Sequence, residues 1–178
     1  NVNDLLCVGA EPIAFVDYIA VPKPDPVIHA AIGASLAEAC TRARVTLAGG
    51  ETASLPGIVT ELDLSGTALG WLAKGSEITG SNLKAGDILI GLPSSGVHSN
   101  GYSLVRNVVD RSGVSWEDAA PFPVDVNRIE RFTEGDVTLG EVFLNPTRIY
   151  CDPIVDLIQN GPCETSEIHG ICHVTGGG

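Results

Sequence analysis

The chain has 178 residues, of which 44% are hydrophobic and 18% charged, so it is long enough to bury a core as one domain or as two small ones. Its 22 acidic and 10 basic residues give a formal net charge of −12, which argues against nucleic acid or an anionic membrane as a partner, because both bind basic surfaces. No run of about 18 apolar residues occurs and the N-terminal stretch lacks the form of a signal peptide, so neither a transmembrane helix nor a secretory leader is expected.

The N-terminal half alternates helix and strand signals. Residues 1–8 have the pattern of a short folded element that ends in a turn at Gly9. Strands are predicted at residues 12–21, which are rich in β-branched and aromatic residues, and at residues 45–50 and 63–73. A helix is predicted after the first strand, with Asp25 as its N-cap, Pro26 in its first turn and apolar residues at helical spacing.

The C-terminal half repeats this alternation after a polar, turn-rich stretch at residues 74–86, which predicts a domain boundary. Strands are predicted at residues 87–92 and 166–174, and helices at residues 102–112 and 145–161. Pro153 should kink the last helix or mark its restart. The acidic residues 113–143 show little periodicity and predict an inserted loop. Strands and helices alternate in both halves, so the fold class is mixed α and β.

The cysteine content and the excess of acidic residues bear on the cellular compartment and on possible ligands. The five cysteines are odd in number, scattered and without a C-x-x-C pair, which predicts free thiols in a reducing cytoplasm. The excess of acids has a plain explanation in solubility or a salt-adapted source. Its functional alternative is divalent-metal binding, which would also let so acidic a protein accept an anionic substrate.

Two stretches of the N-terminal half offer the hard oxygen donors that Mg²⁺ prefers. Asn3 and Asp4 lie on the first helical element, and residues 49–52 (Gly-Gly-Glu-Thr) follow a predicted strand. Each stretch also has a structural interpretation, as a helix ended by Gly and Pro and as a strand-ending turn with a solvated Glu. Spacing alone leaves both alternatives open.

Residues 91–103, GLPSSGVHSNGYS, combine a predicted strand, a polar loop and the start of a helix, which is a natural anion site. Ser95, Ser99 and Asn100 could add donors, and His98 could act as an acid, a base or a plain donor, or have no such role. The stretch lacks the G-x-S-x-G pattern of an acyl-transfer nucleophile.

The terminal stretch ICHVTGGG, residues 171–178, puts three glycines after a predicted strand, which is compatible with a loose tail or with a phosphate-binding loop. Four possible metal ligands lie nearby in the sequence, but their spacing does not match a zinc site: Cys163, His169, Cys172 and His173.

Together and in this order, these stretches resemble the AIR synthetase family, the phosphoribosylformylglycinamidine cyclo-ligases. The D-x-x-x-x-G-A-x-P pattern that begins at Asp4 is shared by a wider ATP-binding superfamily, which includes formylglycinamidine ribonucleotide synthetase, selenophosphate synthetase, thiamine-monophosphate kinase and a hydrogenase-maturation protein. The narrower match lies in GGETASLPG, SSGVHSNGYSLVR, NPTRIY and HVTGGG; the kinase has Asp where Glu51 stands. The resemblance covers nearly the whole chain except residues 113–143.

The resemblance implies an AIR synthetase-like two-domain fold. It implies an N-terminal ATP-binding domain at residues 1–74, whose strands join those of a partner in a homodimer barrel, a linker at 75–85 and a C-terminal α/β domain at 86–178. Both domains are expected to be incomplete, so that the chain alone would lack the full activity. The implied reaction is the ATP-dependent, Mg²⁺-assisted closure of formylglycinamidine ribonucleotide to aminoimidazole ribonucleotide in purine biosynthesis.

The resemblance also implies the site residues. ATP would be bound by Asn3, Asp4, Gly49, Gly50, Glu51 and Thr52, with Mg²⁺ held by Asp4 and Glu51. The substrate would be bound by His98, Ser99, Asn100, Thr147, Arg148, Gly176, Gly177 and Gly178, with His98 and Asp4 as the catalytic residues. Asp17 is a weaker candidate. The alternatives are another member of the superfamily, chiefly formylglycinamidine ribonucleotide synthetase, or a catalytically silent nucleotide-binding fragment.

Overall fold

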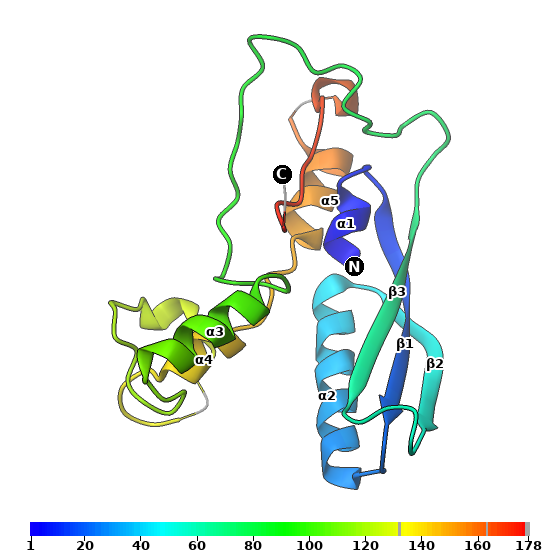
Figure 1. The fold of residues 1–178 in the computed structure, drawn as a ribbon. Coiled ribbons are helices and arrows are strands. Elements are labelled where there is room, and N and C mark those ends of the chain that lie inside the picture. The colour runs from blue at the N-terminus through cyan, green and yellow to red at the C-terminus, as the bar shows by residue number, and fades with distance from the viewer. Residues whose placement is uncertain (132, 163, 177–178) are drawn as a thin grey trace. The chain divides into compact units, whose positions relative to one another are not determined.

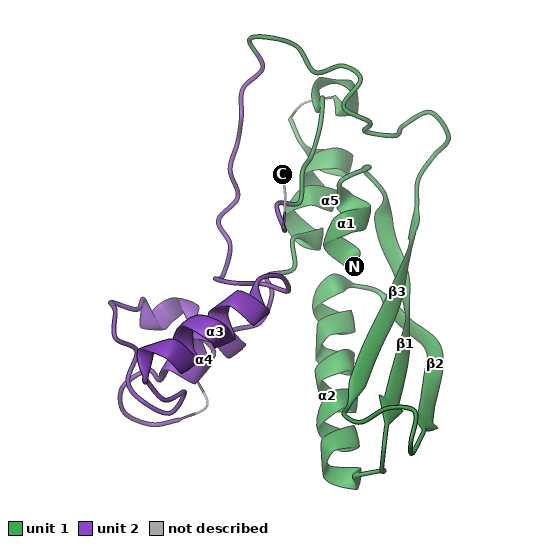
Figure 2. Cartoon of the chain, viewed as in Figure 1, with its two compact units in different colours: residues 1–86, 149–173 green, residues 87–148, 174–178 purple. Residues whose placement is uncertain are grey.

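The computed structural model describes residues 1–131, 133–162 and 164–176, which form two compact units. Unit 1 contains residues 1–86 and 149–173, and unit 2 contains residues 87–148 and the chain from Val174 onward (Figure 2). The units differ from the sequence-based division because residues 149–173 pack with the N-terminal elements. The domain boundary at 75–85 stays a prediction. No described helix has the length and apolar content needed to cross a bilayer.

A three-stranded sheet of order β2-β1-β3 forms the centre of unit 1 (Figure 1). β1 (Glu11–Val21) pairs in parallel with β2 (Thr46–Ser54) and antiparallel with β3 (Asp63–Trp71). The three strands predicted in this half are therefore confirmed. The predicted end of the second strand is wrong, because pairing with β1 continues to Val21↔Ser54 and so includes the Gly-Gly-Glu-Thr stretch.

The crossover between the parallel strands is α2 (Pro26–Ala43), as parallel pairing requires. Its predicted start is confirmed. The Asp25 side chain accepts hydrogen bonds from the backbone N–H groups of Val27, at 2.9 Å, and Ile28, at 3.2 Å. Pro26 occupies the first helical position, where no N–H is needed.

Three helices of unit 1 contribute residues to one hydrophobic core. α1 (Val2–Leu6) and α5 (Cys151–Asn160) pack against the end of α2, and the buried residues are Leu6, Ala43, Cys151, Ile154 and Val155. α5 begins six residues later than predicted, with Pro153 in its first turn, so Pro153 marks a helix start and not a kink. The turn predicted after the N-terminal element is present, with Gly9 at φ 81°. A short 3₁₀ turn, η2, covers Thr165–Glu167.

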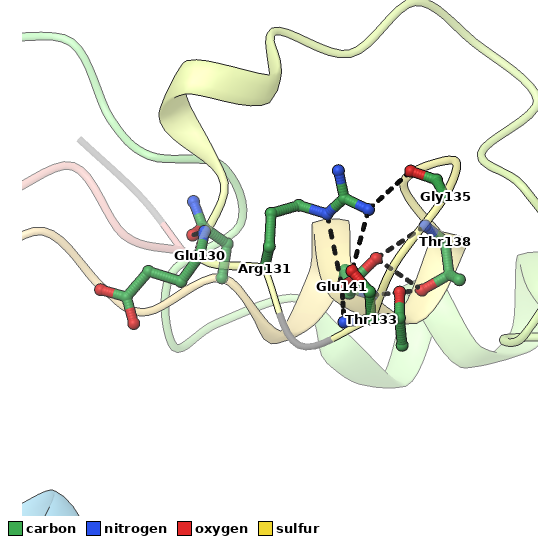
Figure 3. Close-up of polar contacts among 7 residues, drawn as sticks. Glu130, Arg131, Thr133, Gly135, Thr138 and Glu141 are labelled. Atoms are coloured by element: carbon green, nitrogen blue, oxygen red, sulfur yellow. Dashed lines mark hydrogen bonds and ion pairs between the residues drawn. The ribbon is translucent and has the colours of Figure 1, made fainter.

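Unit 2 contains α3 (Tyr102–Ser112), which has the bounds that the sequence predicted. The stretch predicted as an inserted loop contains a 3₁₀ turn, η1 (Val126–Arg128), and the start of α4 (Leu139–Leu144). α4 begins with a capping box between Thr138 and Glu141. Glu141 is only 3% exposed, and its carboxylate also accepts the Thr133 N–H at 2.8 Å and lies 3.6 Å from Arg131 Nε (Figure 3). These contacts order a segment in which no periodic pattern is visible.

Two predicted strands, 87–92 and 166–174, are not formed. A strand needs a neighbour that receives its backbone hydrogen bonds, and neither stretch is paired with one in the part of the chain that the structure describes. Ile88, Leu89 and Ile90 are accordingly between 84% and 93% exposed.

Candidate functional site

Asp4 contacts a histidine that the sequence did not select for the site. Asp4 lies on α1 with its side chain 66% exposed, and its Oδ1 is 2.8 Å from Nδ1 of His173. This hydrogen bond is the main influence on the Asp4 carboxyl and lowers its pKa from the ordinary value. The spacing of charged residues in the sequence could not reveal this contact, because 169 residues separate Asp4 from His173.

Asn3, next to Asp4, is buried at 6% exposure. Its Oδ1 accepts the backbone N–H of Tyr150 at 3.1 Å, which ties α1 to the residue that precedes α5. This oxygen therefore has a structural partner, and a contact of Asn3 with nucleotide stays a prediction.

The Gly-Gly-Glu-Thr stretch lies on β2 opposite β1. Gly50 is paired with Asp17, and a Cβ atom at Gly50 would lie 2.6 Å from the Asp17 carbonyl oxygen and even closer to its carboxylate. Only glycine fits at this position. Gly49 pairs with Val16, and the side chains of Glu51 and Thr52 are exposed and accessible to a ligand.

The described residues contain no group of three or more His, Cys, Asp or Glu side chains arranged to hold a metal ion. Mg²⁺ is commonly held by one or two carboxylates together with substrate phosphates, so a complete protein cage is not required. Asp4 and Glu51 are carboxylates with exposed side chains, and the chemistry of this donor set suits Mg²⁺.

In unit 2, His98 lies within a network of loop residues. Its Nε2 accepts the backbone N–H of Ser95 at 3.1 Å, so the ring proton is assigned to Nδ1. Ser95 Oγ is 2.9 Å from the same nitrogen and donates to the carbonyl oxygen of Pro146 at 2.8 Å. The network therefore places Nε2 of His98 beside the Ser95 hydroxyl group.

The same network brings Arg148 beside His98, as two members of the predicted substrate site. The Arg148 N–H lies 3.5 Å from His98 Nε2, and its Nη1 donates to the Pro93 carbonyl at 3.2 Å. Asn145, which sequence reasoning missed, is buried and donates from Nδ2 to the Ser95 carbonyl at 2.8 Å. Asn145 is the first residue of the NPTRIY motif, and this position could have identified it as a candidate.

The remaining predicted substrate residues are described less completely. Ser99 and Asn100 are exposed just before α3, whose N-cap, Gly101, supplies no side-chain hydrogen bond. The first amides of this 11-residue helix therefore lie beside two polar side chains. Thr147 is half-buried and Gly176 exposed, whereas Gly177 and Gly178 lie outside the described residues.

Comparison with known proteins identifies similar sequences over the whole chain. The family model described as AIR synthase related protein, N-terminal domain, matches residues 1–72, and that of the C-terminal domain matches residues 84–178. Proteins named phosphoribosylformylglycinamidine cyclo-ligase are 46% identical in Methanobrevibacter smithii and in Methanothermobacter thermautotrophicus, and 42% identical in Methanosarcina acetivorans. These alignments cover 99–100% of this chain and 48% of each relative, so the chain spans about half the length of the curated relatives it matches.

Proposed function

Because the chain belongs to the AIR synthase related protein family, we propose that its activity is the ATP-dependent closure of formylglycinamidine ribonucleotide to aminoimidazole ribonucleotide in purine biosynthesis. The observation that carries this proposal is the match of both family models in sequence order, at residues 1–72 and 84–178. Similarity to proteins named cyclo-ligase supports the same reaction over other reactions of the wider superfamily.

The proposed reaction has two steps. The formyl oxygen of the substrate attacks the γ-phosphate of ATP, and ADP leaves. The amidine-side nitrogen then attacks the activated carbon, and the C–O bond breaks with release of phosphate, which closes the imidazole ring. In such phosphoryl transfers the protein contributes mainly positioning and charge neutralisation.

We assign the nucleotide contacts to unit 1. Asp4 and Glu51 would bind Mg²⁺ and Thr52 would contact the phosphates, since all three side chains are exposed and carry oxygen donors. Gly49 leaves the backbone open to close approach, since no atom lies within 4 Å of its Cβ position, and Gly50 beside it would contact the nucleotide through its backbone. When bound, the ion would neutralise charge on the phosphate chain. Asn3, the buried neighbour of Asp4, would complete the ATP-binding residues.

We assign the substrate contacts to unit 2. Arg148 would bind the ribose phosphate, together with Thr147, Gly176, Gly177 and Gly178. Ser99 and Asn100 would add donors at the start of α3. His98 would handle the proton, because its Nε2 lies within hydrogen-bond distance of the Ser95 N–H and hydroxyl groups and an imidazole can accept or donate a proton.

We also propose a cytoplasmic homodimer. Two large apolar residues that alternate along β3 and so lie on one face of the sheet, Leu69 and Trp71, are 48% and 62% exposed. An apolar sheet surface of this kind favours a protein partner, and a second copy is the partner that the family resemblance implies. The described cysteines are all free, which suits a reducing compartment.

The test is turnover by the gene product, expressed with any sequence that flanks the chain. We expect formylglycinamidine ribonucleotide and Mg·ATP to yield aminoimidazole ribonucleotide, ADP and phosphate in equal amounts, measured by diazotisation of the amine and by chromatography of the nucleotides. Asp4→Asn should lower this turnover sharply. Consumption of another superfamily substrate without aminoimidazole formation would overturn the assignment.

A further inference from the structure

His173 lies outside all the residue sets that the sequence predicted for the site, yet its ring packs against Asp4. The Nδ1–Oδ1 distance is 2.8 Å, and the His173 side chain is only 20% exposed whereas that of Asp4 is 66% exposed. A well-packed group thus holds a solvent-facing carboxylate. Because the partners are 169 residues apart, the contact depends on the tertiary fold and not on local sequence.

The surroundings of the ring define its proton position. His173 Nε2 is buried and has no hydrogen-bond partner among the described residues. A proton on Nε2 would be a buried donor without an acceptor, which is costly. The proton is therefore assigned to Nδ1, which donates to Asp4 Oδ1.

Few other interactions among the described residues fix the position of the Asp4 side chain. α1 is five residues long, and helices this short gain little stability from their own hydrogen bonds. The second oxygen of Asp4, Oδ2, lies 3.6 Å from the nitrogen of Asn1, three residues earlier in the chain. The bond from His173 is consequently the main constraint on the rotamer of the Asp4 side chain.

We propose that His173 is a positioning residue for Asp4, which holds Oδ1 so that Oδ2 stays available to a divalent cation carried by the nucleotide phosphates. This inference rests on the proposed function, which assigns Asp4 to the metal. Carboxylates that ligate metals are generally held by such hydrogen bonds, and loss of the partner commonly lowers metal affinity by about 10–100-fold.

The test compares three variants, His173→Ala, His173→Asn and His173→Gln, in the gene product with its flanking sequence. The Asn amide nitrogen takes the place of Nδ1, whereas the Gln amide nitrogen takes the place of Nε2. The readout is the affinity for Mn²⁺ in the presence of a non-hydrolysable ATP analogue, followed by electron paramagnetic resonance of the free ion. The unliganded thermal midpoint of each variant reports whether it folds.

We expect His173→Ala and His173→Gln to weaken Mn²⁺ binding by about 10–100-fold and His173→Asn to retain most of it. A purely structural role would instead lower the thermal midpoint of all three variants without rescue by Asn, and that result would overturn the inference. Unchanged affinity in His173→Ala, with weak binding in Asp4→Asn, would also overturn it but leave the proposed function intact. Equal Mn²⁺ binding by Asp4→Asn and the wild type would remove Asp4 from the metal site and overturn the inference, whereas the proposed reaction is tested separately by formation of aminoimidazole ribonucleotide.

Discussion

Gly50 shows how a single residue is fixed by the packing of two strands. An ideal Cβ at this position would lie 2.6 Å from the carbonyl oxygen of Asp17, which is backbone and cannot move aside without disturbing β1. Gly50→Ala should therefore destabilise the fold by about 1–3 kcal/mol, the usual cost of overpacking a well-packed region. Urea unfolding followed by circular dichroism measures this change.

Gly33 supplies the matched control for the same substitution. It is exposed within α2, and no atom lies within 4 Å of the Cβ that alanine would add. Gly33→Ala should stabilise the protein by about 0.5–1 kcal/mol, because glycine is unfavourable inside a helix. If Gly50→Ala left stability unchanged, or raised it as Gly33→Ala should, the close approach of β1 and β2 at Gly50 would be refuted.

Among the elements, those that carry their own local signals were predictable. α2 was predicted from Asp25 and Pro26 at its start, and α3 was predicted with the bounds that it has, Tyr102–Ser112. Residues 87–92 have the composition of a strand but no paired neighbour in the described structure, and composition cannot report whether a partner is present. α4 was missed because its six residues are too few to show apolar periodicity, although Thr138 and Glu141 have the spacing of a capping box.

The start of α2 gives a prediction at this scale. Asp25 accepts two backbone hydrogen bonds, from Val27 and Ile28, so Asp25→Ala should cost about 0.5–2 kcal/mol of stability. Asp25→Asn keeps an oxygen acceptor at the cap and should stay close to the wild type. Urea unfolding of the two variants separates these expectations, and equal losses would show that the cap does not act through its acceptor.

At the scale of the whole molecule, the sequence led to individual site residues but not to their partners. The motif around His98 and the one around Arg148 were both selected, and the structure brings the backbone N–H of Arg148 beside the imidazole of His98. Asn145 and His173 were missed because their roles depend on contacts across 50 and 169 residues, with Ser95 and Asp4. A sequence motif identifies a ligand-binding residue more readily than it identifies the second residue that positions that side chain.

The apolar sheet surface of unit 1 gives the last prediction. Leu69 is 48% exposed on β3, and an unpaired apolar side chain on a strand favours burial against a partner. If the proposed homodimer uses this surface, Leu69→Lys should shift the protein toward monomer in sedimentation velocity, because each interface would bury the new charges without compensation. Val27→Lys is the control, since Val27 is 79% exposed on α2 and not on the sheet. Equal dimer content in both variants would exclude the β3 surface as the interface.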